Sequence, residues 1–124
     1  MEPSLSYYTS QSPLSDPGAY AYLYEDLPAD PQALARVVQG VLIHKLTIDL
    51  YAIQLSAVQR AEVNLISIAQ RLRRLAELDA TPLVSARPPA ERQVAVCRDF
   101  ALLFVSLLRH QGIPARMRVG FAEY

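Results

Sequence analysis

The stretch from Cys97 to Gln111 constrains the fold most, because it is apolar on nearly every face of a helix. Its apolar side chains are Phe100, Ala101, Leu102, Leu103, Phe104, Val105, Leu107 and Leu108. A helix of this kind must be covered on most sides. Gly112 can adopt a positive φ just past its end, and Pro114 prevents continuation. We therefore expect a buried central helix over residues 97–111.

Two upstream stretches have the apolar spacing of amphipathic helices, one at about residues 31–53 and one at about 57–78. Asp30 can cap the free amides of the first, and Pro31 fits its first helical position. Its apolar face carries Leu34, Val37, Val38, Val41 and Leu42. The apolar face of the second carries Val58, Leu65, Ile66, Ala69, Leu72, Leu75 and Ala76. We expect the two helices to form an antiparallel hairpin.

The chain divides into three parts. Residues 1–18 are rich in Ser, Pro, Tyr and Asp and form an extended arm. Residues 19–80 are the helical region, which ends where prolines interrupt the periodicity. Residues 81–124 begin an α+β core, in which the helix over 97–111 leads to a strand over 115–122 that alternates apolar and polar residues. The predicted fold class is mainly α with one or two strands.

Composition limits the function classes. Lys and Arg total 12 and Asp and Glu total 12, so no net charge attracts nucleic acid or an anionic membrane. No leader pattern and no spanning apolar run of about 18 residues is visible, so we expect a cytoplasmic protein. The single cysteine excludes an intramolecular disulfide and a zinc site of several thiolates. Neither phosphate-loop glycines nor metal-ligand spacings occur, and we expect no cofactor.

Cys97 is the candidate reactive residue. It falls in the first turn of the central helix, where free backbone amides and the positive end of the helix dipole stabilise a thiolate. The amide of the nucleophile can also donate to an oxyanion. The alternative is a structural cysteine, since free cysteines are among the most buried residues. The residue itself leaves both interpretations open.

The residues around Cys97 decide between them, because their order resembles the core of transglutaminase-like, papain-type domains. The matching segments are Cys97-Arg98-Asp99-Phe100-Ala101, Leu107-Leu108-Arg109, Gly112-Ile113-Pro114-Ala115-Arg116 and Gly120-Phe121. They cover roughly the last quarter of the chain, and the upstream helices resemble the helical region of bacterial members. The resemblance implies that Cys97 is the nucleophile. It implies structural roles for the others: Asp99 near the helix start, Phe100 in the core, Gly112 and Pro114 in the turn, and Arg116 in the scaffold.

The sequence departs from the family at the catalytic base. In the family, a histidine on a later strand is the base and an aspartate on the next strand orients it, and nothing follows Tyr124 here. His110 lies about 20 Å from Cys97 along the same helix, too far to act on the sulfur. His44 lies on the polar edge of the first predicted helix, where we interpret it as packed or solvated. We therefore expect a nucleophile without a base.

Two hypotheses follow. In the first, the chain is the N-terminal portion of an acyl-transfer or amide-hydrolysing protein that forms a thioester on Cys97. It is incomplete and inactive as given, and it acts on a peptide or amide substrate once downstream sequence completes it. In the second, it is a non-catalytic helical module for protein interaction that retains the thiol-enzyme motif. In either case, the unpaired strand over 115–121 favours a homo-oligomer.

Two smaller clusters have ordinary interpretations. Tyrosines crowd the N-terminal part of the chain, and such residues commonly anchor an arm to its domain. These are Tyr7, Tyr8, Tyr20, Tyr22 and Tyr24. The basic cluster of Arg71, Arg73 and Arg74 is interpreted as a solvated helix face.

Overall fold

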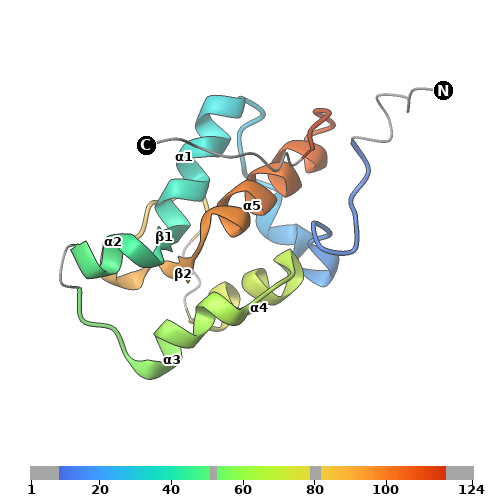
Figure 1. Cartoon of the computed structure of the whole chain (residues 1–124). Coiled ribbons are helices and arrows are strands. Elements are labelled where there is room, and N and C mark those ends of the chain that lie inside the picture. Colours follow the sequence, from blue (N-terminus) through green and yellow to red (C-terminus); the bar gives the residue numbers. More distant parts are fainter. Residues whose placement is uncertain (1–8, 51–52, 79–81, 117–124) are drawn as a thin grey trace, which may run out of the picture.

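The computed structural model describes residues 9–50, 53–78 and 82–116 (Figure 1). Within these ranges the chain is mainly helical with a small parallel sheet, which confirms the predicted fold class. The α-helices are α1 (Pro31–Val41), α2 (Lys45–Leu50), α3 (Ala57–Arg60), α4 (Ile68–Leu78) and α5 (Cys97–His110). The 3-10 helices are η2 (Gly18–Tyr24), η3 (Ala61–Asn64) and η4 (Pro89–Glu91), and the strands are β1 (Leu42–His44) and β2 (Gln93–Ala95). The strand predicted over 115–122 lies almost entirely outside the described residues.

Helix α5 is the centre of the structure, as predicted. Figure 1 shows it running between α1 and α4, and it packs against both. Its buried residues join those of α1 and α4 in one hydrophobic core. The helix ends as the sequence indicates: Gly112 has a φ of 76°, and the amide of Ile113 donates to the carbonyl of Leu108 at 2.9 Å. No helix within the described ranges is long and apolar enough to cross a bilayer.

The first predicted helix begins as expected but ends early. Asp30 accepts a hydrogen bond from the amide of Ala33 at 3.0 Å, and Pro31 takes the first helical position. Instead of continuing to residue 53, the helix stops at Val41, and Leu42 is extended, with φ −114° and ψ 148°. This change lets β1 pair with β2. The spacing of the apolar residues does not distinguish one long helix from a shorter helix followed by a strand, because both would bury the same side chains.

The second predicted helix is also broken. A capping box of Ser56 and Gln59 starts α3, and a reciprocal pair of bonds between Ser67 and Gln70 starts α4. Val58 and Ile66, predicted on the apolar face, are exposed. The expected hairpin is replaced by a different arrangement, in which α1 and α4 each pack against α5. Two helix-capping patterns of the form Ser-x-x-Gln, beginning at Ser56 and Ser67, therefore explain why the predicted helix is broken into α3 and α4.

The N-terminal arm, described from Thr9, packs on α5. The hydroxyl of Tyr24 donates to Ser106 at 2.9 Å, and Ser106 donates to the carbonyl of Ser15 at 2.6 Å. Burial raises the pKa of Tyr24 above its ordinary value. This residue is therefore an anchor of the kind predicted for the tyrosines, whereas residues 7 and 8 lie outside the described ranges.

The two strands run parallel, with Leu42 opposite Gln93 and His44 opposite Ala95. Val94 directs its backbone groups away from β1. Its amide donates to Glu62 Oε1 at 3.3 Å, and its carbonyl accepts from Arg71 Nη1 at 3.1 Å. Side chains thus occupy the edge of β2 where another strand would otherwise pair.

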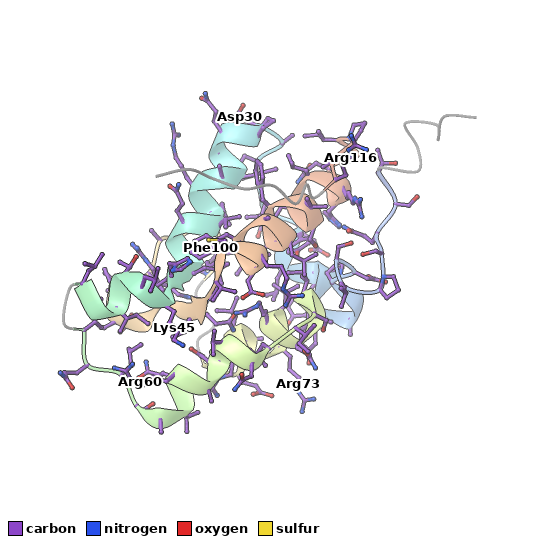
Figure 2. All side chains as sticks on the ribbon, in the orientation of Figure 1. Asp30, Lys45, Arg60, Arg73, Phe100 and Arg116 are labelled. Atoms are coloured by element: carbon purple, nitrogen blue, oxygen red, sulfur yellow. The ribbon has the colours of Figure 1, made fainter. Side chains whose placement is uncertain are left out.

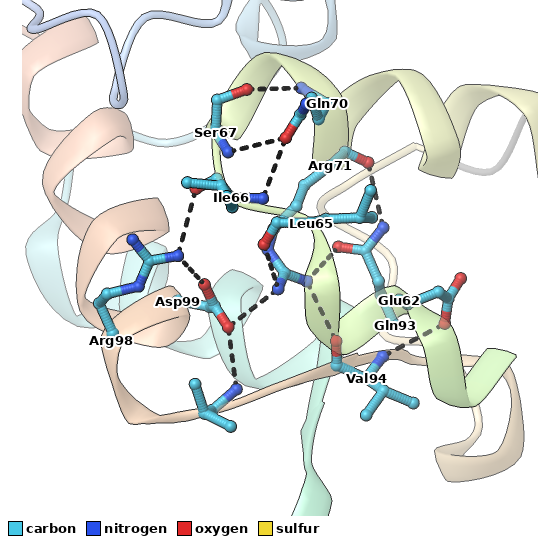
Figure 3. Close-up of polar contacts among 11 residues, drawn as sticks. Glu62, Leu65, Ile66, Ser67, Gln70, Arg71, Gln93, Val94, Arg98 and Asp99 are labelled. Atoms are coloured by element: carbon cyan, nitrogen blue, oxygen red, sulfur yellow. Dashed lines mark hydrogen bonds and ion pairs between the residues drawn. The ribbon is translucent and has the colours of Figure 1, made fainter.

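Arg71 is the centre of a buried polar network (Figure 3). Its Nη2 pairs with Asp99 Oδ2 at 2.8 Å and donates to the carbonyl of Leu65 at 3.1 Å, while its Nη1 also donates to Gln93 Oε1 at 2.9 Å. Burial lowers the pKa of Arg71, and the charge of Asp99 opposes that shift. The prediction that Arg71 is solvated was wrong, since it is only 1% exposed.

We predict that Asp99→Ala lowers the free energy of unfolding by about 3–5 kcal/mol, because it leaves the Arg71 guanidinium buried without its counter-charge. The matched control is Glu77→Gln, which breaks the exposed pair between Arg73 and Glu77 and costs less than about 0.5 kcal/mol. Urea unfolding followed by far-UV circular dichroism measures both. Equal losses in the two variants would show that the buried network does not hold this fold.

Candidate functional site

The parallel strands bring His44 to Cys97. His44 is the last residue of β1, and Cys97 follows β2 by two residues as the first residue of α5. Because parallel strands have their carboxyl ends at the same edge, the two side chains converge there. His44 Nε2 lies 3.2 Å from Cys97 Sγ. The expectation that Cys97 has no histidine within reach is therefore corrected for the described chain.

The ring of His44 is held at its other nitrogen as well. The amide of Leu46, in the first turn of α2, donates to His44 Nδ1 at 3.1 Å, as a helix-capping side chain accepts from the helix start. A backbone amide can only donate, so Nδ1 carries the lone pair and the neutral ring carries its proton on Nε2. Nε2–H therefore points to the sulfur. The ring also lies stacked beside Phe100, with centroids 6.1 Å apart.

Cys97 is exposed, which excludes the structural, buried interpretation of this residue. Its position is fixed by the turn between β2 and α5. Asp99 Oδ2 accepts from the amide of Val96 at 3.0 Å, and the amide of Asp99 donates back to the carbonyl of Val96 at 2.9 Å. The amides of Cys97 and Arg98 belong to the first turn of α5, where helical amides have no acceptor within the helix.

An apolar groove of about 480 Å³ opens beside the sulfur. It lies between α1 and α5, and Figure 2 shows Phe100 at this junction. Its lining residues are Ala35, Val38, Gln39, His44, Cys97, Phe100, Ala101 and Phe104. None of these carries a carboxylate, an ammonium or a guanidinium. The thiol therefore stands at the end of a groove suited to an uncharged group.

The other predicted residues take different positions. Asp99 is structural, as predicted, and its carboxylate is 1% exposed. Phe100 packs against the hydrophobic core, but it is only half-buried and also lines the groove. His110, at the far end of α5, makes an edge contact with the ring of Tyr24 at 5.1 Å.

His44 is the residue whose position sequence reasoning misjudged, since it was interpreted as packed or solvated and lies beside Cys97. The signal was available in two short apolar runs: residues 41–43 lead directly to His44, and residues 94–96 lead directly to Cys97. Two buried runs of this length are consistent with parallel strands. The residues that follow such strands meet at one edge of the sheet.

Comparison with known proteins supports the resemblance of the Cys97 segment to the core of transglutaminase-like domains. The family model of the transglutaminase-like superfamily matches residues 65–124, from just before α4 through the end of the chain. Over these residues the chain is similar to the transglutaminase-like superfamily, a family of the cysteine-enzyme type. The match includes Cys97 and Asp99, and His44 lies outside it. No curated protein and no solved structure matched the chain.

We predict that iodoacetamide alkylates Cys97 readily and that His44→Ala slows this reaction about threefold. A hydrogen bond to a charged group contributes about 1.5 kcal/mol, and the greater nucleophilicity of the more basic thiolate offsets roughly half of it. The control is His110→Ala, which removes the other histidine and leaves the rate unchanged. Mass spectrometry of timed samples gives the rates. Equal rates for His44→Ala and the unaltered chain would show that the ring does not stabilise the thiolate.

Proposed function

We propose that the protein transfers acyl groups through a thioester on Cys97. One observation carries the proposal: an exposed thiol at the start of α5 has an imidazole nitrogen 3.2 Å from its sulfur and an apolar groove beside it. A nucleophile paired with a ring nitrogen is the common arrangement of thiol acyl-transfer sites. The family match supports the same class of chemistry.

The proposed reaction has two steps. The exposed thiol loses its proton to solvent, and the thiolate is stabilised by His44 Nε2–H and the first turn of α5. The sulfur attacks the acyl carbonyl, so that a C–S bond forms while the bond to the leaving group breaks, and an amine leaving group takes its proton from solvent. An acceptor, either water or an amine, then attacks the thioester carbonyl and loses a proton to solvent, and the C–S bond breaks to regenerate the thiolate. The amide of Cys97 is positioned to donate to the oxyanion in both steps.

The alternative is a non-catalytic helical interaction module that retains the thiol-enzyme motif. In both hypotheses the helix start and the His44 contact exist in the folded chain. The hypotheses differ in whether the folded site accelerates acyl transfer to the thiol: the acyl-transfer hypothesis requires this acceleration, and the interaction module does not.

We predict that p-nitrophenyl acetate acetylates Cys97 at least about tenfold faster in the folded chain than in urea, because only the folded site stabilises the thiolate. Nitrophenolate release gives the rate, and peptide mass mapping locates the acetyl group. Cys97→Ala is the control and should form no thioester. If the folded and unfolded chains react alike, or if the acetyl group is found only on other residues, the interaction module is favoured and the proposal fails.

A further inference from the structure

The ring of His44 is held in place by contacts on three sides. The amide of Leu46 donates to Nδ1 at 3.1 Å, Nε2 lies 3.2 Å from Cys97 Sγ, and the ring is stacked beside Phe100 with centroids 6.1 Å apart. Because Nδ1 accepts a hydrogen bond, the neutral ring carries its hydrogen on Nε2. His44 therefore holds one N–H group at a fixed place beside the sulfur.

The site provides a second donor close to the sulfur. The amide of Cys97 belongs to the first turn of α5, where helical amides have no acceptor within the helix. His44 and Cys97 also line the same groove between α1 and α5. A carbonyl carbon that reaches the sulfur from this groove brings its oxygen to a position only two bonds from the sulfur. Both N–H groups therefore border the position that the carbonyl oxygen takes.

The negative charge moves during the proposed reaction. Before attack it lies on the thiolate, and Nε2–H faces this sulfur. In the tetrahedral intermediate the sulfur is a neutral thioether, and the charge lies on the former carbonyl oxygen. A thioether is a weak acceptor, whereas the hydrogen bond from an N–H group to an oxyanion is short and strong. An interaction that strengthens as the charge develops on oxygen lowers the barrier.

We propose that His44 is a catalytic residue that donates its Nε2–H to the oxyanion, together with the amide of Cys97, an inference that rests on the proposed function. When the C–S bond forms, an electron pair of the carbonyl moves to oxygen, and Nε2–H turns from the sulfur to this oxygen. When the C=O bond forms again, the bond to the leaving group breaks. The hydrogen stays on Nε2 throughout, so this role is separate from acid–base catalysis by other residues.

The test compares acylation with alkylation of Cys97 in the same variant of the full chain. Acetylation by p-nitrophenyl acetate passes through an oxyanion and alkylation by iodoacetamide does not, while both begin with the thiolate. The ratio of the two rates therefore corrects for a change in the thiolate population. This ratio should fall at least about tenfold in His44→Ala. Loss of one oxyanion donor costs about 10²–10³ in rate, and the bond that the same donor makes to the thiolate before attack offsets part of this cost.

Two further variants are matched to this one. His44→Gln keeps an N–H donor but has no basic nitrogen. It should restore the ratio to within about threefold of the unaltered chain, because two neutral N–H donors contribute similarly. His110→Ala removes the other histidine, at the far end of α5, and should leave the ratio unchanged.

The outcomes separate the inference from the proposed function. If His44→Ala leaves the ratio as it is in the unaltered chain, His44 does not donate to the oxyanion, and the inference is overturned while the proposed function stands. The same holds if the ratio falls as far in His44→Gln as in His44→Ala, since the ring would then act through its basic nitrogen. If p-nitrophenyl acetate does not label Cys97 in the unaltered chain, the proposed function itself is overturned.

Discussion

The parallel pairing of β1 with β2 is the interaction on which the site depends. His44 and Cys97 are 53 positions apart in the sequence, and three facing residue pairs bring them to one edge of the sheet. The imidazole follows directly from one strand and the thiol begins the helix after the other. A shift of the register by one residue would turn His44 to the opposite face and separate the two groups. A short sheet therefore determines whether the thiol has a partner.

Buried charges hold this sheet in place. Arg71 and Glu62 satisfy the outer backbone groups of β2 at Val94, and the same guanidinium reaches Asp99 in the first turn of α5. Arg71 has partners at both terminal nitrogens, while its Nε has none. Such a network adds less to the net free energy of unfolding than it does to selecting one arrangement of the segments that it joins. Here that arrangement is the turn that presents Cys97.

The sequence predicted the features that local chemistry determines. The cap at Asp30, the central helix from Cys97 and the stop at Gly112 each follow from a few neighbouring residues. It did not predict β1, because the two buried residues after α1, Leu42 and Ile43, have the same apolar pattern in a strand as in a helix, and only pairing with β2 decides between them.

His44 was misplaced for the same reason. The prediction that Arg71 is solvated was wrong because it rested on the charge of arginine and not on the position of the residue in the helix. Arg71 lies three residues after Ile68 and four before Leu75, both of which are buried. The positions of charged and titratable groups were therefore the least predictable part of the site, because distant segments supply their partners.

The nitrogen chemical shifts of the His44 ring test the central claim most directly. In chain labelled with ¹⁵N, we expect the neutral form with hydrogen on Nε2 and a lone pair on Nδ1, since Nδ1 accepts from Leu46 and Nε2 faces the sulfur. The Nε2 shift should change in Cys97→Ala, while the ring of His110 stays as it was. A His44 ring that averages both neutral forms and does not respond to Cys97→Ala would contradict the account.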